Sequence, residues 1–448
     1  MTARTARRLP VHAGPPAWDA ILPARVPGPV LEGGTTADVV VIGAGFAGLS
    51  AARRLLQINV GARVVVLEAG RIGEGATGRN SGFMIDLPHE LTSEDYAGAS
   101  QQGDGAMTAL NRHAIAFARE AVAEYGIDPN YFDPAGKVNG AASAGADAHN
   151  HSYATRLEAL GEPYEMLDAQ AMCALTGSRH YRSGLYTPGT VVLQPAGYVR
   201  GLADGLVRAG VRIFEKTPVT RFARRGSDWQ VEARGGAVTA PRVILAVNGH
   251  LESFGFHRNR LMHVFLFASM TEELPPEALA RLGGHSRWGI TPADPMGTTL
   301  RRIDTGQGGN RLVARSVAVY KPGMETTPAE MTRATATLRR KFDARFPQLA
   351  DIRMEHVWSG HLCLSRNGVS VARALEPGLF SACCQNGLGT TRGTLTGIAA
   401  AEAASGITSP VADFFAAQDS PTRLPPPPLS TIGATATMRW KEWGARQE

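Results

Sequence analysis

The sequence is poor in the features of membrane-spanning and exported proteins. Its 448 residues contain no apolar run of about 18 residues, so a membrane span is not expected. The basic start, Met1–Arg8, is followed by Pro10, Pro15 and Pro16 in place of the apolar stretch of a signal peptide. We therefore expect a cytoplasmic protein.

Cysteine is also scarce. The 4 cysteines have neither the spacing of a zinc site nor that of a disulfide framework; they are Cys173, Cys363, Cys383 and Cys384. The last two lie in an apolar segment and are expected to be small core residues. The sequence thus offers no candidate metal site.

Lysine is nearly absent. The chain has 41 arginines and 5 lysines, and its formal net charge is +6. These basic residues form no block interleaved with aromatic residues, which argues against nucleic-acid binding. A mildly positive surface that attracts anionic substrates is an alternative to a solvated surface with no role. With 44% hydrophobic and 19% charged residues the composition is ordinary for a globular protein, and the length suits two domains.

The sequence does contain a dinucleotide-binding pattern near its start. Four β-forming residues run into Gly43-x-Gly45-x-x-Gly48, and a helix-like segment, residues 49–56, follows. In such a motif the first glycine makes the tight turn, the second lets the backbone approach the pyrophosphate, and the third lets the helix pack on the strand. The anion then lies at the helix N-terminus.

A carboxylate ends the next predicted strand. Residues 63–67 are β-forming and lead to Glu68, 25 residues after Gly43, where it can accept a hydrogen bond from a ribose hydroxyl. The alternative is a glycine turn in an unrelated βα unit. Strand, glycines, helix and carboxylate together favour a bound dinucleotide.

The residues that follow favour FAD over NAD. The glycine-rich stretch of residues 68–82 can wrap a pyrophosphate and a flavin with backbone donors. It resembles the D-amino-acid oxidase superfamily of flavoproteins, which includes glycine oxidase, sarcosine oxidase and D-amino-acid dehydrogenase. Within that family, Gly78–Gly82 most resembles the polyamine-catabolic branch that acts on γ-glutamylputrescine-like amines.

Three further segments extend the resemblance over residues 38–405. Residues 194–219 resemble the family's central helix–strand pair, 240–249 the strand that closes the flavin domain, and 378–402 the flavin-ring loop and its helix. The resemblance implies an α/β fold. It has a discontinuous Rossmann-like FAD-binding domain and a second α+β substrate domain built on an antiparallel sheet, with the active site at their interface.

The expected domain boundaries follow from these matches and from composition. They are an N-terminal arm (1–35), an FAD-binding domain (36–95, 190–250 and 355–410), a substrate domain (96–189 and 251–354) and a C-terminal tail (411–448). The arm is rich in proline and glycine and is expected to pack over the first domain or to stay mobile.

Several local structures are predicted from the residue pattern. Strands near 219–224, 228–233 and 242–247 suggest a β-meander. Thr327–Phe346 has the capping box and proline of an amphipathic helix. The tetraproline Pro425–Pro428 predicts an extended tail over Pro421–Glu448.

The resemblance and the fingerprint imply a set of residues that contact FAD. For Arg79 and Asn80 the alternative is anchoring of their own loop through side-chain-to-backbone hydrogen bonds. The expected FAD-contacting residues are Gly43, Gly45, Phe46, Ala47, Gly48, Glu68, Ala69, Thr77, Arg79, Asn80, Ser81, Val219, Gly387, Gly389, Thr390 and Thr391.

The absence of other redox motifs suggests where the electrons come from. The sequence has no second dinucleotide fingerprint and no paired redox cysteines, so the organic substrate is expected to reduce the flavin. An amine or amino acid presents its α C–H to flavin N5, and the product imine hydrolyses. Oxygen or a quinone then reoxidises the flavin, and the sequence leaves that choice open.

Cations are expected to orient a substrate carboxylate. By resemblance Arg392 lies within one residue of the family's cationic position, while Arg301 and Arg302 lie on a strand expected to cover the flavin. Each arginine has a structural ion pair as its alternative. His361 is a candidate ring neighbour or acid–base group, with a structural histidine as the alternative. Cys363 falls close to the flavin-linked cysteine of sarcosine oxidases, and a buried unmodified thiol is favoured for it.

Rival functions remain at this stage. A flavin monooxygenase is disfavoured because the late motif, residues 386–389, lacks the Gly-Asp pattern typical of that class. An FAD-containing subunit of a larger complex is a second rival. An RNA-modifying relative is a third, supported only by the basic charge. The sequence is compatible with a homo-oligomer and does not fix the oligomeric state.

Overall fold

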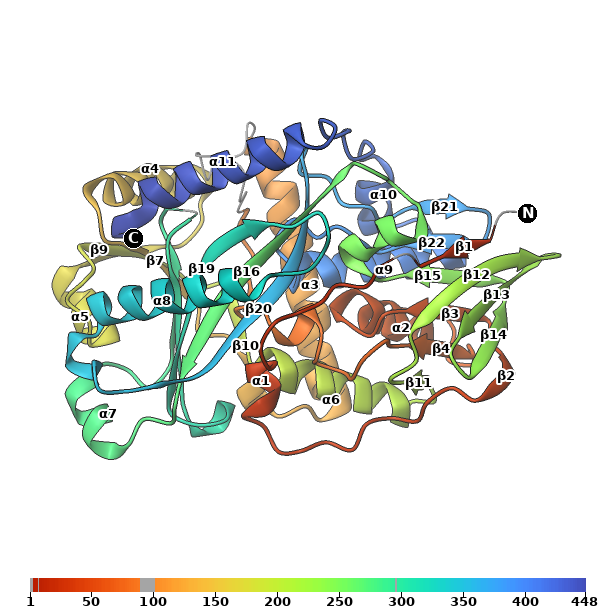
Figure 1. The fold of residues 1–448 in the computed structure, drawn as a ribbon, viewed down its shortest axis with the longest axis horizontal. Helices are drawn as coiled ribbons and strands as arrows, with labels where there is room; N and C mark the ends of the chain where they lie inside the picture. The colour runs from red at the N-terminus through yellow and green to blue at the C-terminus, as the bar shows by residue number, and fades with distance from the viewer. Residues whose placement is uncertain (1–2, 7, 89–100, 295) are drawn as a thin grey trace.

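The computed structural model describes residues 3–6, 8–88, 101–294 and 296–448, and within them the strands form four sheets. The two largest sheets occupy opposite halves of the molecule (Figure 1). This mixed α/β architecture confirms the predicted fold class. How the chain divides into domains remains a prediction.

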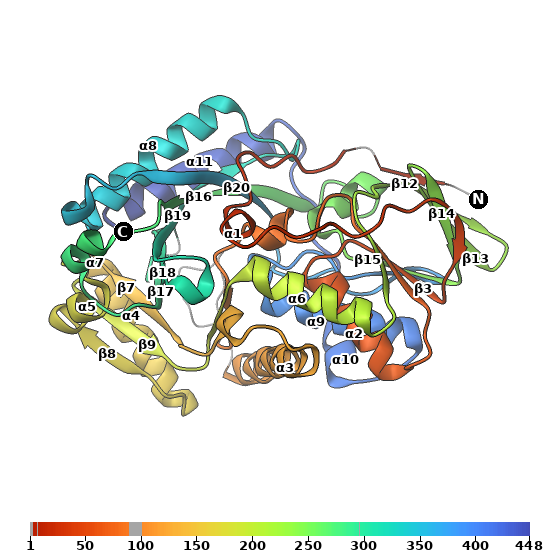
Figure 2. The same ribbon diagram turned by 90° about the horizontal axis from the view of Figure 1, so that it is seen from below.

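The first large sheet has six strands, all parallel except the last. Helices cover one of its faces and lie together in Figure 2. Another sheet, described below, covers the other face. The central strands of the six-stranded sheet are therefore buried on both sides and consist of continuous apolar residues. The strand order is β11 (Arg212–Phe214), β4 (Val64–Leu67), β3 (Val39–Ile42), β15 (Arg242–Leu245), β22 (Leu379–Ser381) and β21 (Ala374–Glu376). The covering helices are α2 (Phe46–Ile58), α6 (Pro195–Arg208) and α9 (Thr391–Ser405), and α3 (Gln101–Tyr125) packs on α6 and α9.

A five-stranded sheet covers the other face. Its order is β1 (Arg4–Thr5), β12 (Val219–Arg225), β13 (Asp228–Ala233), β14 (Gly236–Ala240) and β2 (Gly33–Thr36). The meander prediction is wrong in its third strand. That strand is β14, because a turn at Gly235 returns the chain at once, and residues 242–245 join the parallel sheet instead.

The second large sheet has eight strands. Its order is β20 (Met354–Ser365), β16 (Leu261–Thr271), β19 (Arg311–Tyr320), β18 (Thr299–Ile303), β17 (Trp288–Pro292), β7 (Lys137–Ala141), β9 (Ser183–Thr187) and β8 (Glu165–Asp168). Helix α8 (Pro328–Arg345) packs on one face, and its predicted capping box, Thr327 with Glu330, is confirmed. Strand β20 lies in this sheet although the expected boundary at residue 355 assigns most of it to the FAD-binding domain.

The described part of the N-terminal arm packs against the body of the protein. Trp18, in α1 (Ala17–Ala20), is fully buried, and its indole N–H donates to the carbonyl of Asn80 at 2.8 Å. Glu215 accepts from the backbone N–H of Gly28 at 2.8 Å and pairs with Arg25. Of the two outcomes foreseen for the arm, these contacts match packing.

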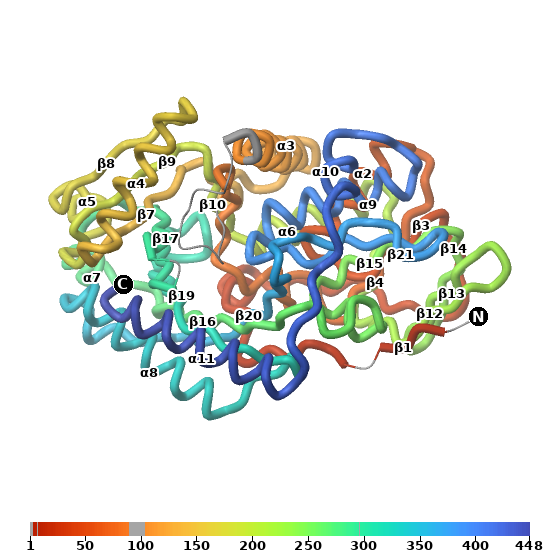
Figure 3. Tube along the Cα trace, turned by 90° about the horizontal axis from the view of Figure 1, so that it is seen from above, coloured from red at the N-terminus to blue at the C-terminus, as the bar shows by residue number. Residues whose placement is uncertain are grey.

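The predicted extended tail is wrong over most of its length. After the prolines the chain forms α11 (Leu429–Gly444), which lies along β19 and β16 (Figure 3). The tetraproline ends where the helix begins, with Pro428 at its N-cap, so the prolines set its start and do not prevent it. The preceding residues include α10 (Pro410–Ala416).

No helix among the described residues is long and apolar enough to cross a membrane. All four cysteines are free thiols, and the three at positions 363, 383 and 384 are buried, as expected for core residues. The described residues also contain no cluster of side chains able to hold a metal ion.

Helices α2 and α9 approach so closely that only glycine fits at their crossing. A Cβ placed on Gly397 would overlap the carbonyl oxygen of Ala47 in α2. We predict that Gly397→Ala lowers the free energy of unfolding by about 1–3 kcal/mol, because the helices must separate. The urea midpoint and the flavin content measure this. As a control, Gly105→Ala in α3, where a Cβ meets nothing within 4 Å, should leave the midpoint unchanged or raise it. Equal midpoints for the two variants would contradict the packing argument.

Candidate active site

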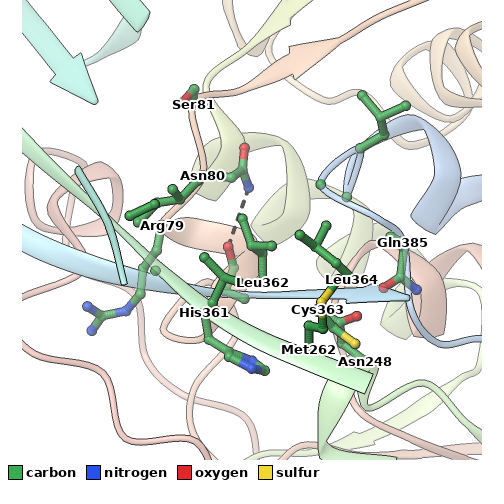
Figure 4. A pocket seen from close by; sticks show the side chains of 18 of the residues that line it. Arg79, Asn80, Ser81, Asn248, Met262, His361, Leu362, Cys363, Leu364 and Gln385 are labelled. Atoms are coloured by element: carbon green, nitrogen blue, oxygen red, sulfur yellow. Dashed lines mark hydrogen bonds between the residues drawn. The ribbon is translucent and has the colours of Figure 1, made fainter. Parts of the chain in front are cut away.

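One large cavity lies where the parallel sheet meets the eight-stranded sheet. Its volume is about 810 Å³, within the usual range of small-molecule sites. Figure 4 looks into it. It is lined by the start of α2, the loop 76–83, the turn after β15, the inner face of the eight-stranded sheet, the loop 385–390 and α11. The carboxyl ends of the parallel strands therefore meet the eight-stranded sheet at this cavity, as expected for a ligand site in an open α/β sheet.

The three fingerprint glycines are each required by close contacts. Gly43 has a φ of +103°, and a Cβ there would lie 2.6 Å from the carbonyl oxygen of Ala246. A Cβ on Gly48 would overlap the carbonyl of Gly43, and one on Gly45 would lie 2.7 Å from Oγ1 of Thr77. Gly45 is the one of the three that lines the cavity, so the backbone is bare where the ligand approaches.

Glu68 lies beside this turn. Its carboxylate accepts from the backbone N–H of Ala44 at 2.8 Å and of Gly70 at 2.9 Å. Burial raises the pKa of the Glu68 carboxyl, and the two N–H donors oppose that rise. Each carboxylate oxygen has a second lone pair, so Glu68 can still accept from a ribose hydroxyl.

Two helix N-termini face the cavity. Helix α2 begins at Phe46 and α9 at Thr391, and neither has an acidic residue in its first turn. Gly393 of α9 packs against Phe46, since a Cβ placed on this glycine would lie 3.2 Å from Cβ of the phenylalanine. The unpaired N–H groups and the helix dipoles therefore favour negative charge at one end of the cavity.

The loop that follows β4 is held by its own side chains. Arg79 donates to the carbonyl oxygens of Glu74 at 2.8 Å, Gly14 at 3.0 Å and Ser359 at 3.2 Å. Burial lowers the pKa of Arg79 to about 10. Asn80 accepts from the N–H of Gly82 and donates to the carbonyl of Thr77 (Figure 4). Both residues line the cavity, and their polar groups make the anchoring bonds that were the alternative to direct FAD contact.

The remaining predicted FAD contacts divide into two groups. Thr390 lines the cavity and donates its hydroxyl to the carbonyl of Phe83, while Thr391 donates to the carbonyl of Ile85. The other predicted residues in the lining are Gly45, Phe46, Ala47, Thr77, Ser81, Gly387 and Gly389. Those that lie outside it are Gly43, Gly48, Glu68, Ala69, Val219 and Thr391.

The three predicted substrate-binding arginines do not line the cavity. Arg301 is buried, donates to Ser81 at 3.2 Å and Gln307 at 3.1 Å, and lies over the Trp18 ring at 4.9 Å. Burial lowers the pKa of Arg301 to about 9. Arg302 donates to the carbonyl of Gly283. Arg392, in the first turn of α9, donates to the carbonyl of Gly368 at 3.3 Å. Their catalytic roles remain predictions.

A different arginine lies on the cavity face of the eight-stranded sheet. Arg315 on β19 pairs with Ala268 on β16 and with Thr299 on β18, and all three line the cavity. The Thr299 hydroxyl is buried without a hydrogen-bond partner among the described residues, as is Oδ1 of Asn248 in the turn after β15. None of these residues was a candidate from the sequence. The available signal was Arg315 in the middle of a strand, residues 311–320, that is mainly apolar.

His361 lines the cavity, but its ring belongs to a buried chain of polar groups. Its Nε2 is 3.1 Å from Nδ1 of His263, whose Nε2 is 3.1 Å from a carboxylate oxygen of Glu252. Burial, followed by the charge of His263, lowers the pKa of His361 well below its ordinary value. In Figure 4 the His361 ring and the Leu362 side chain lie on opposite sides of β20.

Cys363 also belongs to the lining of the cavity, and it is buried. Burial, with a contribution from the neighbouring Cys384, raises the pKa of its thiol well above the ordinary value. A raised thiol pKa is typical of an inert structural cysteine.

Comparison with known proteins identifies the family. The model of the DAO family, described as FAD dependent oxidoreductase, matches residues 38–403. The chain is 28% identical over 413 residues to the probable oxidoreductase OrdL of Rhizobium meliloti (strain 1021), covering 89% of this chain and 90% of that protein. It is 27% identical over 376 residues to gamma-glutamylputrescine oxidoreductase of Escherichia coli (strain K12), covering 82% of this chain and 83% of that protein. Glycine oxidase from Geobacillus kaustophilus has a similar solved structure, with a TM-score of 0.70 at 19% identity over 88% of this chain and 100% of that chain.

The chain therefore belongs to the DAO family of FAD-dependent oxidoreductases. It is an enzyme whose cofactor is FAD, which confirms the predicted family resemblance and cofactor. The site fits this group on three counts: the bare backbone at Gly45, the two helix N-termini free of acidic residues, and the unpartnered Oδ1 of Asn248.

The glycine contacts predict a way to remove the cofactor selectively. Gly45→Val places a branched side chain where the pyrophosphate must approach, so the variant should fold but be purified without FAD. Absorbance near 450 nm, a wavelength at which flavins absorb, relative to protein measures this. Gly75→Val is the control, because Gly75 is extended at φ −76° and ψ −161° and a Cβ there meets nothing within 4 Å. A yellow Gly45→Val protein with wild-type flavin content would refute the placement.

Proposed function

We propose that this enzyme oxidises the C–N bond of an amino acid or a secondary amine, with hydride transfer to flavin N5 and hydrolysis of the resulting imine. The observation that carries the proposal is the continuity of a single cavity. It joins the two anion-favouring helix N-termini to a sheet face that carries a cation and a buried unpartnered hydroxyl. Cofactor and substrate can therefore meet inside it.

The source of the electrons supports the same reaction class. The loop from parallel strand β22 to α9 also carries glycines, Gly387 and Gly389, but it lines the same cavity as Gly45 and so forms no separate second dinucleotide site. Cys383 and Cys384 are adjacent but fully buried, and burial raises the pKa of Cys383 to about 12, which does not suit a redox thiol. We infer that the organic substrate itself reduces the flavin. The name of the related gamma-glutamylputrescine oxidoreductase agrees with an amine.

The residues around the cavity have distinct parts in this proposal. Bound FAD would supply the hydride acceptor. Arg315 would pair with the substrate carboxylate, and the Thr299 hydroxyl would donate to the same group, so that the α-carbon is held in one orientation. The apolar side chains of β16 and β20 exclude water. Since cations and a dry environment disfavour an ammonium ion, this setting favours the neutral amine that the reaction requires.

Anaerobic mixing with candidate substrates tests the reaction class. Flavin absorbance should bleach with one or more compounds in a panel of D- and L-amino acids and N-alkyl amines, and should not bleach rapidly with NADH or NADPH. The corresponding alcohols and 2-hydroxy acids serve as controls for C–O oxidation. Rapid bleaching by NADPH, or by hydroxy acids alone, would overturn the proposal.

The position of Arg315 predicts a substrate-binding phenotype. Removing a charge-assisted pair in a partly dry site costs about 2–4 kcal/mol, so Arg315→Ala should lower kcat/KM for a carboxylated substrate roughly 30- to 1000-fold while FAD stays bound. Arg315→Lys should recover only part of this, since lysine cannot pair in the bidentate geometry.

Arg392→Ala is the matched comparison, because Arg392 was the first candidate from the sequence and its guanidinium reaches the carbonyl of Gly368 instead of the cavity. We expect it to change kcat/KM far less than Arg315→Ala. A larger loss in the Arg392 variant would return the anchoring role to that residue.

A further inference from the structure

Helix α11 forms one wall of the cavity. The residues it contributes recur every three to four positions and so occupy one face of the helix. They are Leu429, Ser430, Gly433, Ala434, Thr437, Met438 and Lys441. The middle of this face is small: Gly433 and Ala434 leave space, and a Cβ on Gly433 meets nothing within 4 Å.

The opposite wall is the cavity face of the eight-stranded sheet, and the part of it that packs with α11 is apolar. Ala434 and Met438 of α11 belong to one hydrophobic cluster with side chains from β16, β19 and β20. The sheet residues of this cluster that also line the cavity are Met262, Val264, Leu266, Ala318, Tyr320, Leu362 and Leu364. Sheet and helix thus enclose an apolar part of the cavity, which we call the α11 chamber.

Contacts at its far end hold α11 in place over the sheet. Glu442 pairs with Arg333 of α8 at 2.6 Å. The Glu448 carboxylate accepts from the N–H of Ser143 at 2.7 Å, and its backbone oxygen accepts from Lys341 at 2.9 Å. The helix lies outside residues 38–403, the part that matches the family model. One wall of the chamber is therefore formed by a segment that the family match does not include.

We propose that the α11 chamber receives an extended apolar chain of the substrate, and that α11 selects for it. The chamber continues the same cavity from Arg315 and Thr299, so its occupant carries a carboxylate at one end and a hydrocarbon chain at the other. The substrate class is an amino acid with a long apolar substituent on the α-carbon or on the nitrogen. The amine part of this assignment rests on the proposed function, while the chamber itself can be tested without turnover.

Binding of simple carboxylates to the oxidised holoenzyme tests the chamber. Acetate, butyrate, hexanoate and octanoate are titrated while the flavin absorbance is followed, and Kd should fall about fourfold for each added methylene. Ala434→Phe fills the chamber and should abolish this gain for hexanoate and octanoate while leaving acetate unchanged. Ala436→Phe is the matched control: Ala436 is exposed on the same helix and does not line the cavity, so it should keep the wild-type series.

A second variant keeps the test valid if Ala434→Phe fails to fold. Gly433→Leu adds a side chain to the chamber and improves the helix propensity, so it should fold and also flatten the series. Flavin content and melting temperature of each variant verify folding. A wild-type series with no dependence on chain length, or equal slopes in wild type and Ala434→Phe, would overturn the proposal.

Oxidation of two isomeric substrates shows whether the apolar chain is attached to the α-carbon or to the nitrogen. The isomers 2-aminooctanoate and N-hexylglycine carry the same chain on carbon and on nitrogen, and the preferred isomer should lose kcat/KM in Ala434→Phe but not in Ala436→Phe. If carboxylates bind with the predicted series but no amine bleaches the flavin, the chamber stands and the proposed reaction fails.

Discussion

The close crossing of α2 and α9 is the constraint on which the rest of the site depends. Gly397 in α9 lets the backbone of α2 approach, and Gly48 in α2 lets that helix lie against the turn at Gly43. Both helices therefore begin at the carboxyl edge of the parallel sheet, side by side. Their positive ends concentrate at one end of the cavity, and the eight-stranded sheet meets them there. A larger side chain at either glycine would move this end of the site.

The strand–turn–helix unit expected to bind the cofactor could be predicted from the sequence because local geometry determines which residues it needs. A tight turn, a bare backbone and a close helix each demand glycine, and the capping box at Thr327 demands its own residue pair. The proposed substrate half depends on contacts between segments distant in the chain. Arg315 is one of 41 arginines, and only the pairing of β19 with β16 and β18 turns it toward the cavity. Arg392 is the opposite case. Its place in the sequence is one residue from the family's cationic position, and its side chain reaches the carbonyl of Gly368 instead of the cavity.

Helix α11 is the part of the fold that the local sequence pattern predicted least well. Four prolines precede it, and its first nine residues include three threonines, an isoleucine and a glycine, which predict helix weakly. Its stability comes from packing on β19 and from the contacts of Glu442 and Glu448 with α8 and with the start of α4 (Ala144–Leu160). Tertiary contacts of this kind override propensity. They also make α11 a wall of the cavity.

The central claim is that one cavity holds FAD at the α2 and α9 N-termini and a carboxylated chain between Arg315 and α11. A crystal structure of the holoenzyme with octanoate tests it most directly. The account predicts the pyrophosphate at the start of α2, the carboxylate on Arg315 and Thr299, and the hydrocarbon chain between Leu266 and Met438. A carboxylate bound at Arg392 or Arg301, or a chain directed away from α11 into solvent, would contradict it.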